Sequence, residues 1–268
     1  MQVNNKVFVV TGGGNGMGRE VVLGLIKRGA RVAAVDLNEA GLAETATLAN
    51  AGDRLTTHTV NVSDREAVLA LPAAVKAAHG QVDGLFNVAG IIQPFVKVAE
   101  LDFEIIERVM NVNFWGVVNM SKAFLPELLQ RPESGLVNVS SMGGFVPVPG
   151  QAAYGASKAA VKLFTEALYA ESQGTSLAVT VVFPGGVSTN ITGNSGVDTS
   201  RLEAAAAGAK PRKTTTPADA GRQIIEGLEK GAYRVRIGDD ATFMDRFSRL
   251  APRRATLLIA NQMKSLLG

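Results

Sequence analysis

Residues 11–18 read TGGGNGMG and stand between a short apolar run, 6–11, and a stretch, 16–29, that predicts a helix. Glycine occupies positions 12, 16 and 18. A backbone without side chains can turn tightly and approach a pyrophosphate at the N-terminus of the following helix, where free N–H groups and the helix dipole favour anions. The order of strand, glycine loop and helix therefore predicts a dinucleotide-binding fold. Arg19, in the first helical turn, is either solvated or close to the phosphate.

Asp36 ends the next predicted strand, RVAAVD at 31–36, and lies eighteen residues after Gly18. That spacing is typical of a carboxylate that binds the hydroxyls of a ribose and repels a 2′-phosphate. Leu37 follows, so no arginine is present there to receive a 2′-phosphate. These residues favour NAD over NADP. The alternative is an aspartate that only forms a turn at the strand end.

Short apolar runs alternate with amphipathic stretches along the chain. Predicted strands lie at 6–11, 31–36, 54–62, 82–90, 135–141, 176–183 and 233–238. Predicted helices lie at 16–29, 39–50, 63–78, 101–130 (as one helix or two), 151–173 and 217–230. Apolar strands that are each followed by a helix predict a doubly wound parallel sheet of about seven strands, covered by helices on both faces.

We therefore expect a single α/β Rossmann domain over 1–268, with a substrate loop or lid at about 190–215 and an amphipathic tail at about 241–268. The alanine run inside the lid can also form a short helix. Two helix starts have recognisable signals. Ser63-Asp64-Arg65-Glu66 is a capping-box pattern, and Thr216-Pro217 predicts an N-cap followed by proline at the first helical position.

The composition excludes several classes of site and partner. The 268 residues include no cysteine and two histidines, so disulfides, zinc sites and Ser-His-Asp hydrolysis lack their usual groups, and we expect no metal. The net charge is +3, but no dense basic stripe with interleaved aromatics points to nucleic acid. No window of about 18 apolar residues exists, and the N-terminal apolar run is too short for a signal peptide. We expect a cytoplasmic protein without a membrane partner.

A second group of residues lies in SSMGGFVPVPGQAAYGASK, at 140–158. Tyr154 and Lys158 are four residues apart, so they share a face if this segment is helical. A phenol, with a pKa of about 10, is a poor base at neutral pH, and a nearby ammonium is expected to lower that pKa. Ser141 can then hydrogen-bond a substrate oxygen, with Ser140 as its rival. The alternative is an ordinary helix with a packed tyrosine and a solvated lysine.

Taken together, these motifs resemble the short-chain dehydrogenase/reductase family over about residues 5 to 190. The matching features, in chain order, are TGGGNGMG, NVAG at 87–90, Asn113 in NFWG, the set of Ser141, Tyr154 and Lys158, and Pro184-Gly185 after a strand. At three positions the sequence differs from residues that are common in the family. Val88 replaces the second asparagine of the family's NNAG motif. Asn61 stands where aspartate is usual, and Asn15 stands where NADP-preferring members often carry a basic residue.

The resemblance implies a role for each matching residue. Its catalytic set is Asn113, Ser141, Tyr154 and Lys158, with Asn113 holding a water that links Lys158 to solvent. Its cofactor-binding set is Gly12, Asn15, Gly16, Met17, Gly18, Asp36, Leu37, Asn61, Val62, Asn87, Ala89, Gly90, Tyr154, Lys158, Pro184, Gly185, Val187 and Thr189. The backbone near Val187 and the hydroxyl of Thr189 are implied to meet the nicotinamide carboxamide, although Thr189 can instead be a simple N-cap.

The residues that flank this centre are nearly all apolar. They are Ile91, Ile92, Phe95, Met142, Phe145, Val148, Val187 and Ile191. They predict a hydrophobic secondary alcohol or ketone as substrate of an NAD-dependent dehydrogenase. The alternatives are an NADP-dependent carbonyl reductase, a catalytically silent NAD-binding regulator on the same fold, and a lyase or epimerase that retains NAD. Apolar helices at about 111–130 and 151–173 predict a homodimer or homotetramer, and the tail closes the pocket or joins subunits.

Overall fold

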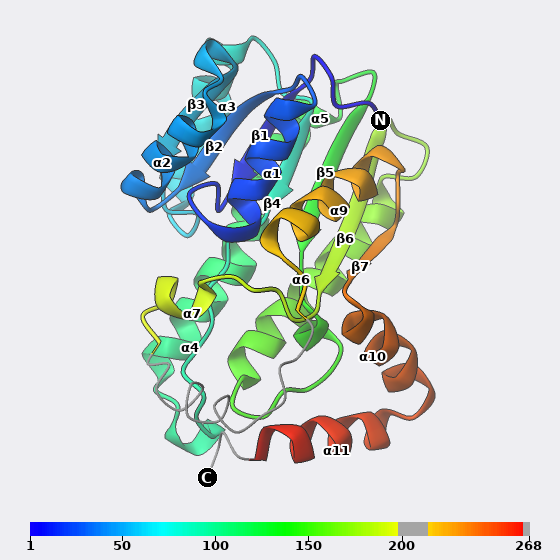
Figure 1. The fold of residues 1–268 in the computed structure, drawn as a ribbon. Helices are drawn as coiled ribbons and strands as arrows, with labels where there is room; N and C mark the ends of the chain where they lie inside the picture. Colours follow the sequence, from blue (N-terminus) through cyan, green and yellow to red (C-terminus); the bar gives the residue numbers. More distant parts are fainter. Residues whose placement is uncertain (198–213, 265–268) are drawn as a thin grey trace.

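The computed structural model describes residues 1–197 and 214–264, and its centre is one sheet of seven parallel strands in the order β3-β2-β1-β4-β5-β6-β7 (Figure 1). The strands are β1 Val7–Thr11, β2 Arg31–Asp36, β3 Leu55–Thr59, β4 Gly84–Asn87, β5 Ser134–Val139, β6 Leu177–Pro184 and β7 Arg234–Ile237. The predicted doubly wound fold is confirmed. The chain builds outward from β1 in both directions, which creates a crevice for ligands at the carboxyl ends of β1 and β4.

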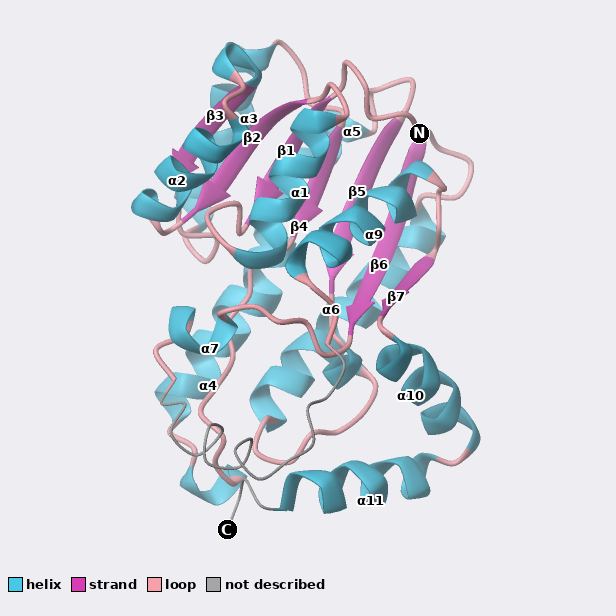
Figure 2. Cartoon of the chain, viewed as in Figure 1, coloured by secondary structure: helices cyan, strands magenta, loops and turns pink. Residues whose placement is uncertain are grey.

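Helices lie on both faces of this sheet (Figure 2). The helices that cover the sheet are α1 Gly16–Lys27, α2 Glu39–Ala49, α3 Arg65–His79, α5 Gly116–Leu128, α6 Ala152–Glu171 and α9 Pro217–Glu229. The others are α4 Phe103–Met110, α7 Ile191–Asn194, α10 Asp239–Leu250 and α11 Pro252–Met263. Short 3₁₀ turns occupy Gly52–Arg54, Val98–Glu100 and Met142–Gly144.

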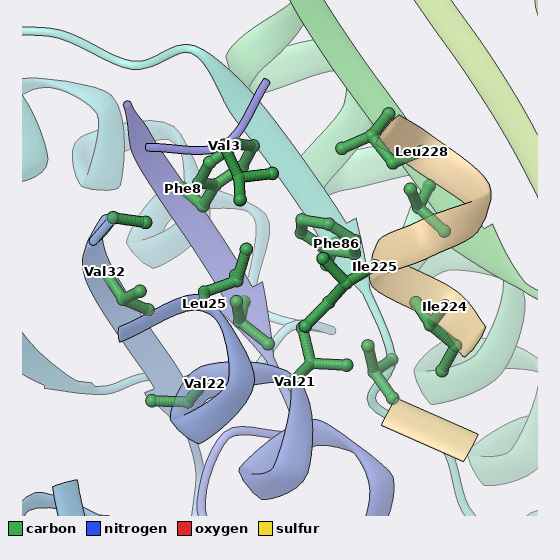
Figure 3. Packing of buried hydrophobic residues seen from close by; sticks show 14 of the residues in the cluster. Val3, Phe8, Val21, Val22, Leu25, Val32, Phe86, Ile224, Ile225 and Leu228 are labelled. Carbon is green, nitrogen blue, oxygen red and sulfur yellow. The ribbon is translucent and has the colours of Figure 1, made fainter. Parts of the chain in front are cut away.

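Alternate residues of each strand enter two separate hydrophobic cores. In β1, Phe8 and Val10 pack toward α1 and α9, whereas Val7 and Val9 pack toward α3, α5 and α6. The first core is shown in Figure 3, where Phe8 and Phe86 lie 5.6 Å apart between their ring centroids. A side chain at Gly84 would run into the Phe8 ring at 2.5 Å, so the glycine makes room for this pair. Burial on both faces explains why a central strand such as β1 is apolar along its length, whereas the edge strands β3 and β7 are more polar and only partly buried.

The helix starts agree with the sequence in one case and differ by a residue in the other. Thr216 caps α9 as predicted, because its hydroxyl accepts a hydrogen bond from Asp219 N at 3.1 Å. The capping box was placed one residue too early, because Asp64 and not Ser63 is the N-cap of α3. The Ser63 hydroxyl instead donates to Asn61 Oδ1 at 2.8 Å.

The segment predicted as one or two helices at 101–130 is α4 and α5 joined by a π-helical turn, Asn111–Trp115. The predicted tail is two helices, α10 and α11. Of the predicted lid, the first part contains the short helix α7. Residues 198–213, which include the alanine run, lie outside the described residues.

Candidate active site

A cavity of about 640 Å³ opens at the carboxyl ends of β1, β2 and β4. The predicted residues that line it are Gly12, Asn15, Gly16, Met17, Gly18, Asp36, Leu37, Asn61, Val62, Ala89, Gly90, Ile91, Thr189 and Ile191. Residues that the sequence analysis missed also line it: Asn38, Val60, Ser63, Val88, Glu104, Glu107, Arg108, Asn111, Val112 and Asn194. Most of the predicted cofactor residues thus surround one space, although they come from distant parts of the chain.

The glycine loop has the shape that a pyrophosphate requires. Gly12 and Gly16 have φ angles of +72° and +53°, a region that residues with a Cβ rarely adopt. A Cβ at Gly18 would collide with the carbonyl oxygen of Gly12. Asn15, the N-cap of α1, makes no side-chain hydrogen bond to the first turn. The backbone N–H groups at this helix N-terminus can therefore bind an anion, and the loop fits the phosphates of a dinucleotide.

Asp36 is held in place at the edge of the cavity by two backbone groups. Its Oδ2 accepts a hydrogen bond from Gly14 N at 2.9 Å, and its Oδ1 accepts one from Asn38 N at 3.0 Å. Each carboxylate oxygen keeps a further lone pair. The carboxylate is therefore fixed in orientation and can still accept hydrogen bonds from ribose hydroxyls.

Arg19 binds the protein on the side of the loop that faces α2. Its Nη2 donates to Gly14 O and to Glu44 Oε2, both at 2.6 Å, and its Nε donates to Thr45 Oγ1 at 3.0 Å. The Thr45 hydroxyl in turn donates to Gly13 O at 2.8 Å. Of the two roles considered for Arg19, neither describes this arrangement, because the guanidinium fixes the glycine loop to α2.

Tyr154, Lys158 and Ser141 come together where α6 begins. Lys158 Nζ lies 6.0 Å from the centre of the Tyr154 ring and donates to Val139 O at 3.0 Å. Ser141 and Tyr154 lie on the same side of Gly143, because a Cβ at Gly143 would lie 3.5 Å from both Ser141 Oγ and Tyr154 Cε1. Ser141 Oγ accepts a hydrogen bond from Gly143 N at 3.0 Å. A serine, a phenol and an ammonium of this kind can bind one substrate oxygen and exchange a proton with it.

The rival serine, Ser140, has a different environment. Its hydroxyl is buried and donates to Lys158 O at 2.7 Å, so it joins the end of β5 to α6. A side chain at Gly144 would come within 2.8 Å of the same carbonyl oxygen. Ser140 therefore supports the helix, and Ser141 is the serine beside Tyr154.

Burial shifts both titratable groups of this centre. It raises the pKa of Tyr154, and the neighbouring Ser141 hydroxyl offsets this only in part. Burial also lowers the pKa of Lys158 to about 8. The expectation that Lys158 lowers the pKa of Tyr154 is therefore wrong for the protein alone. The physical reason is that the ammonium points to Val139 O, so the desolvation of the phenol dominates.

The shifted pKa of Lys158 leads to a prediction on stability. At pH 7 the folded protein must hold an ammonium in a buried place, so we expect Lys158→Met to raise the free energy of unfolding by about 2 kcal/mol. Between pH 8 and 10 the folded protein loses this proton before the unfolded chain does, so wild-type stability rises and the difference shrinks. Urea unfolding of the wild type and the variant at pH 7, 8, 9 and 10 measures the difference in the free energy of unfolding and its change with pH. A difference that does not change with pH would show that the lysine is solvated.

Asn113 lies in the π-helical turn, fully buried. Its Oδ1 accepts from Ile91 N at 2.9 Å, and its Nδ2 donates to Ile91 O at 2.9 Å and to Ser157 Oγ at 3.0 Å. A Cβ on Gly90 would lie 3.1 Å from Lys158 Nζ and 3.3 Å from Asn113 Oδ1. The amide therefore holds the 90–91 backbone beside Lys158, and π-helical turns are frequent at functional sites. The water implied for Asn113 stays a prediction.

Gln93 is a residue of the site that the sequence analysis did not find. Its side chain is fully buried, and its Oε1 accepts from Ala153 N at 2.8 Å and from Tyr154 N at 3.0 Å. Its Nε2 donates to Gly150 O at 3.0 Å. Gln93 thus satisfies the first N–H groups of α6, as an N-cap would, and positions the backbone of Tyr154.

We expect Gln93→Leu to lower kcat roughly 10- to 100-fold, because loss of two acceptor bonds lets Tyr154 move away from the reacting oxygen. The KM for the cofactor should stay within about twofold, since Gln93 does not line the cavity. Steady-state kinetics measure both kcat and the KM for the cofactor. Gln173→Leu, after the end of the same helix, is the control and should change neither constant. An equal loss in kcat and cofactor affinity would indicate a general structural role.

Asn87 is placed differently from the other predicted cofactor residues. It is buried, and its Nδ2 donates to Asn138 Oδ1 at 2.8 Å and to Ser121 Oγ at 3.4 Å. The side chain lies in a polar network between β4, β5 and α5 and does not line the cavity. Five other predicted cofactor residues also lie outside the cavity lining: Tyr154, Lys158, Pro184, Gly185 and Val187. Thr189 and Ile191, a few residues later, do line it.

The residues predicted to form a substrate pocket are not gathered in one place. Met142, Phe145 and Val148 pack against an apolar cluster that includes Met244 and Ile259 of the C-terminal helices. Of the others, Val187 packs on the main core, and Ile191 lines the cavity. Ile92 N donates to Ser195 Oγ at 3.0 Å, which joins its loop to α7, and Phe95 is half-buried in that loop.

Two other features are absent from the described residues. Across 1–197 and 214–264, no helix is long and apolar enough to cross a membrane. In the same residues, no group of three or more His, Cys, Asp or Glu side chains is arranged to hold a metal ion.

Comparisons with known proteins agree with this geometry. Residues 6–199 match the family model described as short chain dehydrogenase. SadH of Mycobacterium tuberculosis is 40% identical over 250 residues, which cover 91% of this chain and 90% of SadH. The 3beta-hydroxysteroid dehydrogenase 2 of Eggerthella lenta is 34% identical over 188 residues, 69% of this chain and 72% of that protein.

Two crystal structures of dehydrogenases are similar along their length. A short chain dehydrogenase/reductase from Burkholderia phymatum in complex with NAD has a TM-score of 0.83 and 25% identity, over 94% of this chain and 96% of that one. A short chain dehydrogenase from Burkholderia cenocepacia in complex with NADP has a TM-score of 0.81 and 26% identity, over 97% and 99%. One neighbour thus binds NAD and the other NADP.

Proposed function

Because this chain belongs to the short-chain dehydrogenase/reductase family, we propose that it interconverts a hydrophobic secondary alcohol and its ketone with NAD as the cofactor. The observation that carries this proposal is the position of Tyr154. It stands one helical turn before Lys158 and next to Ser141. These three side chains do not line the cavity that the glycine loop and Asp36 enclose, but a Cβ on Gly90, which does line it, would lie 3.1 Å from Lys158 Nζ. An oxidoreductase of this family needs these groups together.

The residues of the site have separate tasks in this mechanism. The nicotinamide, when bound, takes up or supplies the hydride. Ser141 donates a hydrogen bond to the substrate oxygen and holds it beside the Tyr154 hydroxyl. Tyr154 donates a proton to that oxygen in reduction and removes one in oxidation. In the protein alone Lys158 donates to Val139 O and does not lower the pKa of Tyr154, so its proposed task is to hold the ribose of the nicotinamide.

The pKa of Tyr154 has a consequence for pH dependence. Since burial raises this pKa, the phenol is protonated at pH 7 and ready to donate a proton, which suits reduction. Oxidation needs the phenolate, whose fraction grows about tenfold per pH unit below the pKa. We expect kcat/KM for alcohol oxidation to rise steadily from pH 7 to 9, while that for ketone reduction changes little. Initial rates in both directions measure this, and parallel profiles would contradict the assignment of Tyr154.

NAD is proposed over NADP because of the charge at the ribose end of the cavity. The fixed Asp36 carboxylate repels a 2′-phosphate, and Leu37 offers it no partner. Arg19, the nearest guanidinium in the glycine loop, is bound to Glu44 and to Gly14 O. The alternative, an NADP-dependent carbonyl reductase, needs one of these groups to rearrange.

The oligomeric state and location are part of the proposal. Trp115 and Leu163 are exposed large apolar side chains next to α5 and on α6, at 44% and 66%. Burying them against a second copy supports a homodimer or homotetramer built on these helices. We also propose that the protein acts in the cytoplasm, on a small hydrophobic substrate and without nucleic acid.

Absorbance at 340 nm tests the proposed function. Oxidation is assayed with a panel of hydrophobic secondary alcohols and NAD or NADP. Reduction is assayed with the matching ketones and the reduced cofactors. The expected result is turnover with NAD. Turnover with NADP alone would overturn the interpretation of Asp36. Tight NAD binding without turnover of any substrate would favour the silent regulator, or a lyase or epimerase that retains NAD.

A further inference from the structure

The last two helices form an arm outside the sheet (Figures 1 and 2). We call α10 and α11, residues 239–263, the C-terminal arm. One side of this arm is buried, where Met244, Ala255 and Ile259 pack against Val146. The same cluster includes Met142, Phe145 and Val148, which follow Ser141 in the sequence. The arm is therefore anchored beside the candidate active site.

The outer side of the arm exposes large apolar side chains. Phe243, Leu250, Leu257 and Leu258 are 57%, 86%, 50% and 36% exposed. In α10, Phe243 and Leu250 are seven residues apart, so they lie on one side of the helix, whereas Phe247 between them is partly buried against the inner cluster. The rings of Phe243 and Phe247 stack at 5.4 Å. Single exposed leucines are ordinary, but four such side chains on one short arm indicate a surface that meets an apolar partner.

The charges of the arm are of one sign beyond its first turns. From residue 246 to 264 the sequence contains no aspartate or glutamate, and its charged residues are Arg246, Arg249, Arg253, Arg254 and Lys264. Of the three aspartates earlier in α10, Asp239 in the first turn is exposed. Asp240 Oδ2 accepts from Gly186 N at 2.8 Å, and the buried Asp245 pairs with Arg236 and Arg249. The outer surface thus combines leucine, phenylalanine and arginine.

This combination fits an anionic lipid surface better than another copy of the chain. Two copies in contact through their arms would bring their arginines together without any carboxylate from 246–264 to neutralise them. At a bilayer surface, leucine and phenylalanine enter the acyl boundary while neighbouring arginines reach the phosphates. We propose that the C-terminal arm docks the protein on the surface of an anionic lipid bilayer without crossing it.

The docked arrangement places the bilayer on the side of the arm that faces away from the candidate active site. The inner side of the arm contacts Met142 and Phe145, which follow Ser141 in the sequence. The proposal replaces the expectations that the tail joins subunits and that no membrane is a partner. It does not depend on the proposed reaction.

Vesicle co-sedimentation of the full chain tests the proposal. The probes are vesicles of phosphatidylcholine alone and vesicles with about one third phosphatidylglycerol. Each basic residue near such a surface contributes enough for about a fivefold change in binding. We therefore expect binding to the anionic vesicles only, weakened on raising the salt from about 0.05 to 0.5 M.

Two variants separate the apolar and basic parts of the surface. Arg253→Glu with Arg254→Glu should weaken binding more than about tenfold, and Leu250→Gln with Leu257→Gln should do the same. The matched controls are Lys27→Glu with Lys97→Glu, and Leu48→Gln with Leu69→Gln, all exposed elsewhere. They should bind as the wild type does. Circular dichroism checks folding, and Arg253→Gln with Arg254→Gln serves if the charge reversal unfolds the chain.

Three results would overturn the proposal. The first is no binding of the wild type to anionic vesicles. The second is binding that the arm variants and the controls change equally, which would indicate nonspecific attraction of a basic protein. The third is a doubled mass in sedimentation that the leucine variant of the arm abolishes, without vesicle binding. That result would assign the surface to a second copy of the chain.

Discussion

Tyr154→Phe should lower kcat by about 10³-fold or more, in both reaction directions, at every pH between 6 and 9. The substitution removes one hydroxyl, the group that lies on the same side of Gly143 as Ser141 and that exchanges the proton with the substrate oxygen in the proposed mechanism. Binding of NADH, followed by its fluorescence, should stay within about threefold, because the ring itself and Lys158 remain in place.

The matched control is Tyr169→Phe. Tyr169 lies on the same helix, α6, with its ring 4.4 Å from that of Tyr233, and it takes no part in the candidate site. Its kcat should match that of the wild type. A Tyr154→Phe enzyme that keeps more than about a tenth of the activity would show that another group moves the proton.

The second large effect concerns the choice of cofactor. Asp36→Asn combined with Leu37→Arg should change the ratio of kcat/KM for NAD and NADP by about 10³-fold toward NADP. The carboxylate that repels a 2′-phosphate loses its charge, and an arginine gains the chance to bind that phosphate in a bidentate manner. The amide keeps an oxygen for Gly14 N, so the glycine loop should stay folded.

Initial rates with both cofactors and one shared substrate measure this ratio. Asp53→Asn is the control, since Asp53 pairs with Arg31 at 3.2 Å and does not line the cavity. It should leave the ratio unchanged. A wild type that already prefers NADP, or a double variant with the wild-type ratio, would contradict the role proposed for Asp36.

The sheet could be predicted from the sequence because its signals are local. The central strands are apolar runs, and the strand predicted at 31–36 has the same bounds in the structure. Thr216 was found as an N-cap for the same reason, since its partner is three residues away. Ser63 was chosen wrongly as a cap because Asp64 also fits the role, and only the backbone conformation decides between them.

The features that the sequence did not predict depend on contacts between distant residues. Gln93 Oε1 accepts a hydrogen bond from Ala153 N in the first turn of α6, sixty residues later in the sequence. No local sequence pattern predicts such a contact. The π-helical turn that carries Asn113 is paired with Ile91, again far away in the chain. The pKa of Tyr154 was expected to fall because spacing alone places it near Lys158, but burial is a property of the whole fold.

Transfer of a labelled hydride tests the central claim most directly. The protein is incubated with a mixture of hydrophobic ketones and with NADH that carries deuterium at both C4 positions. The masses of the alcohols formed are then determined by mass spectrometry. We expect alcohols that contain one deuterium on the carbinol carbon, and no labelled alcohol from the Tyr154→Phe variant in the same time. Bound cofactor with no labelled alcohol from any ketone would contradict it.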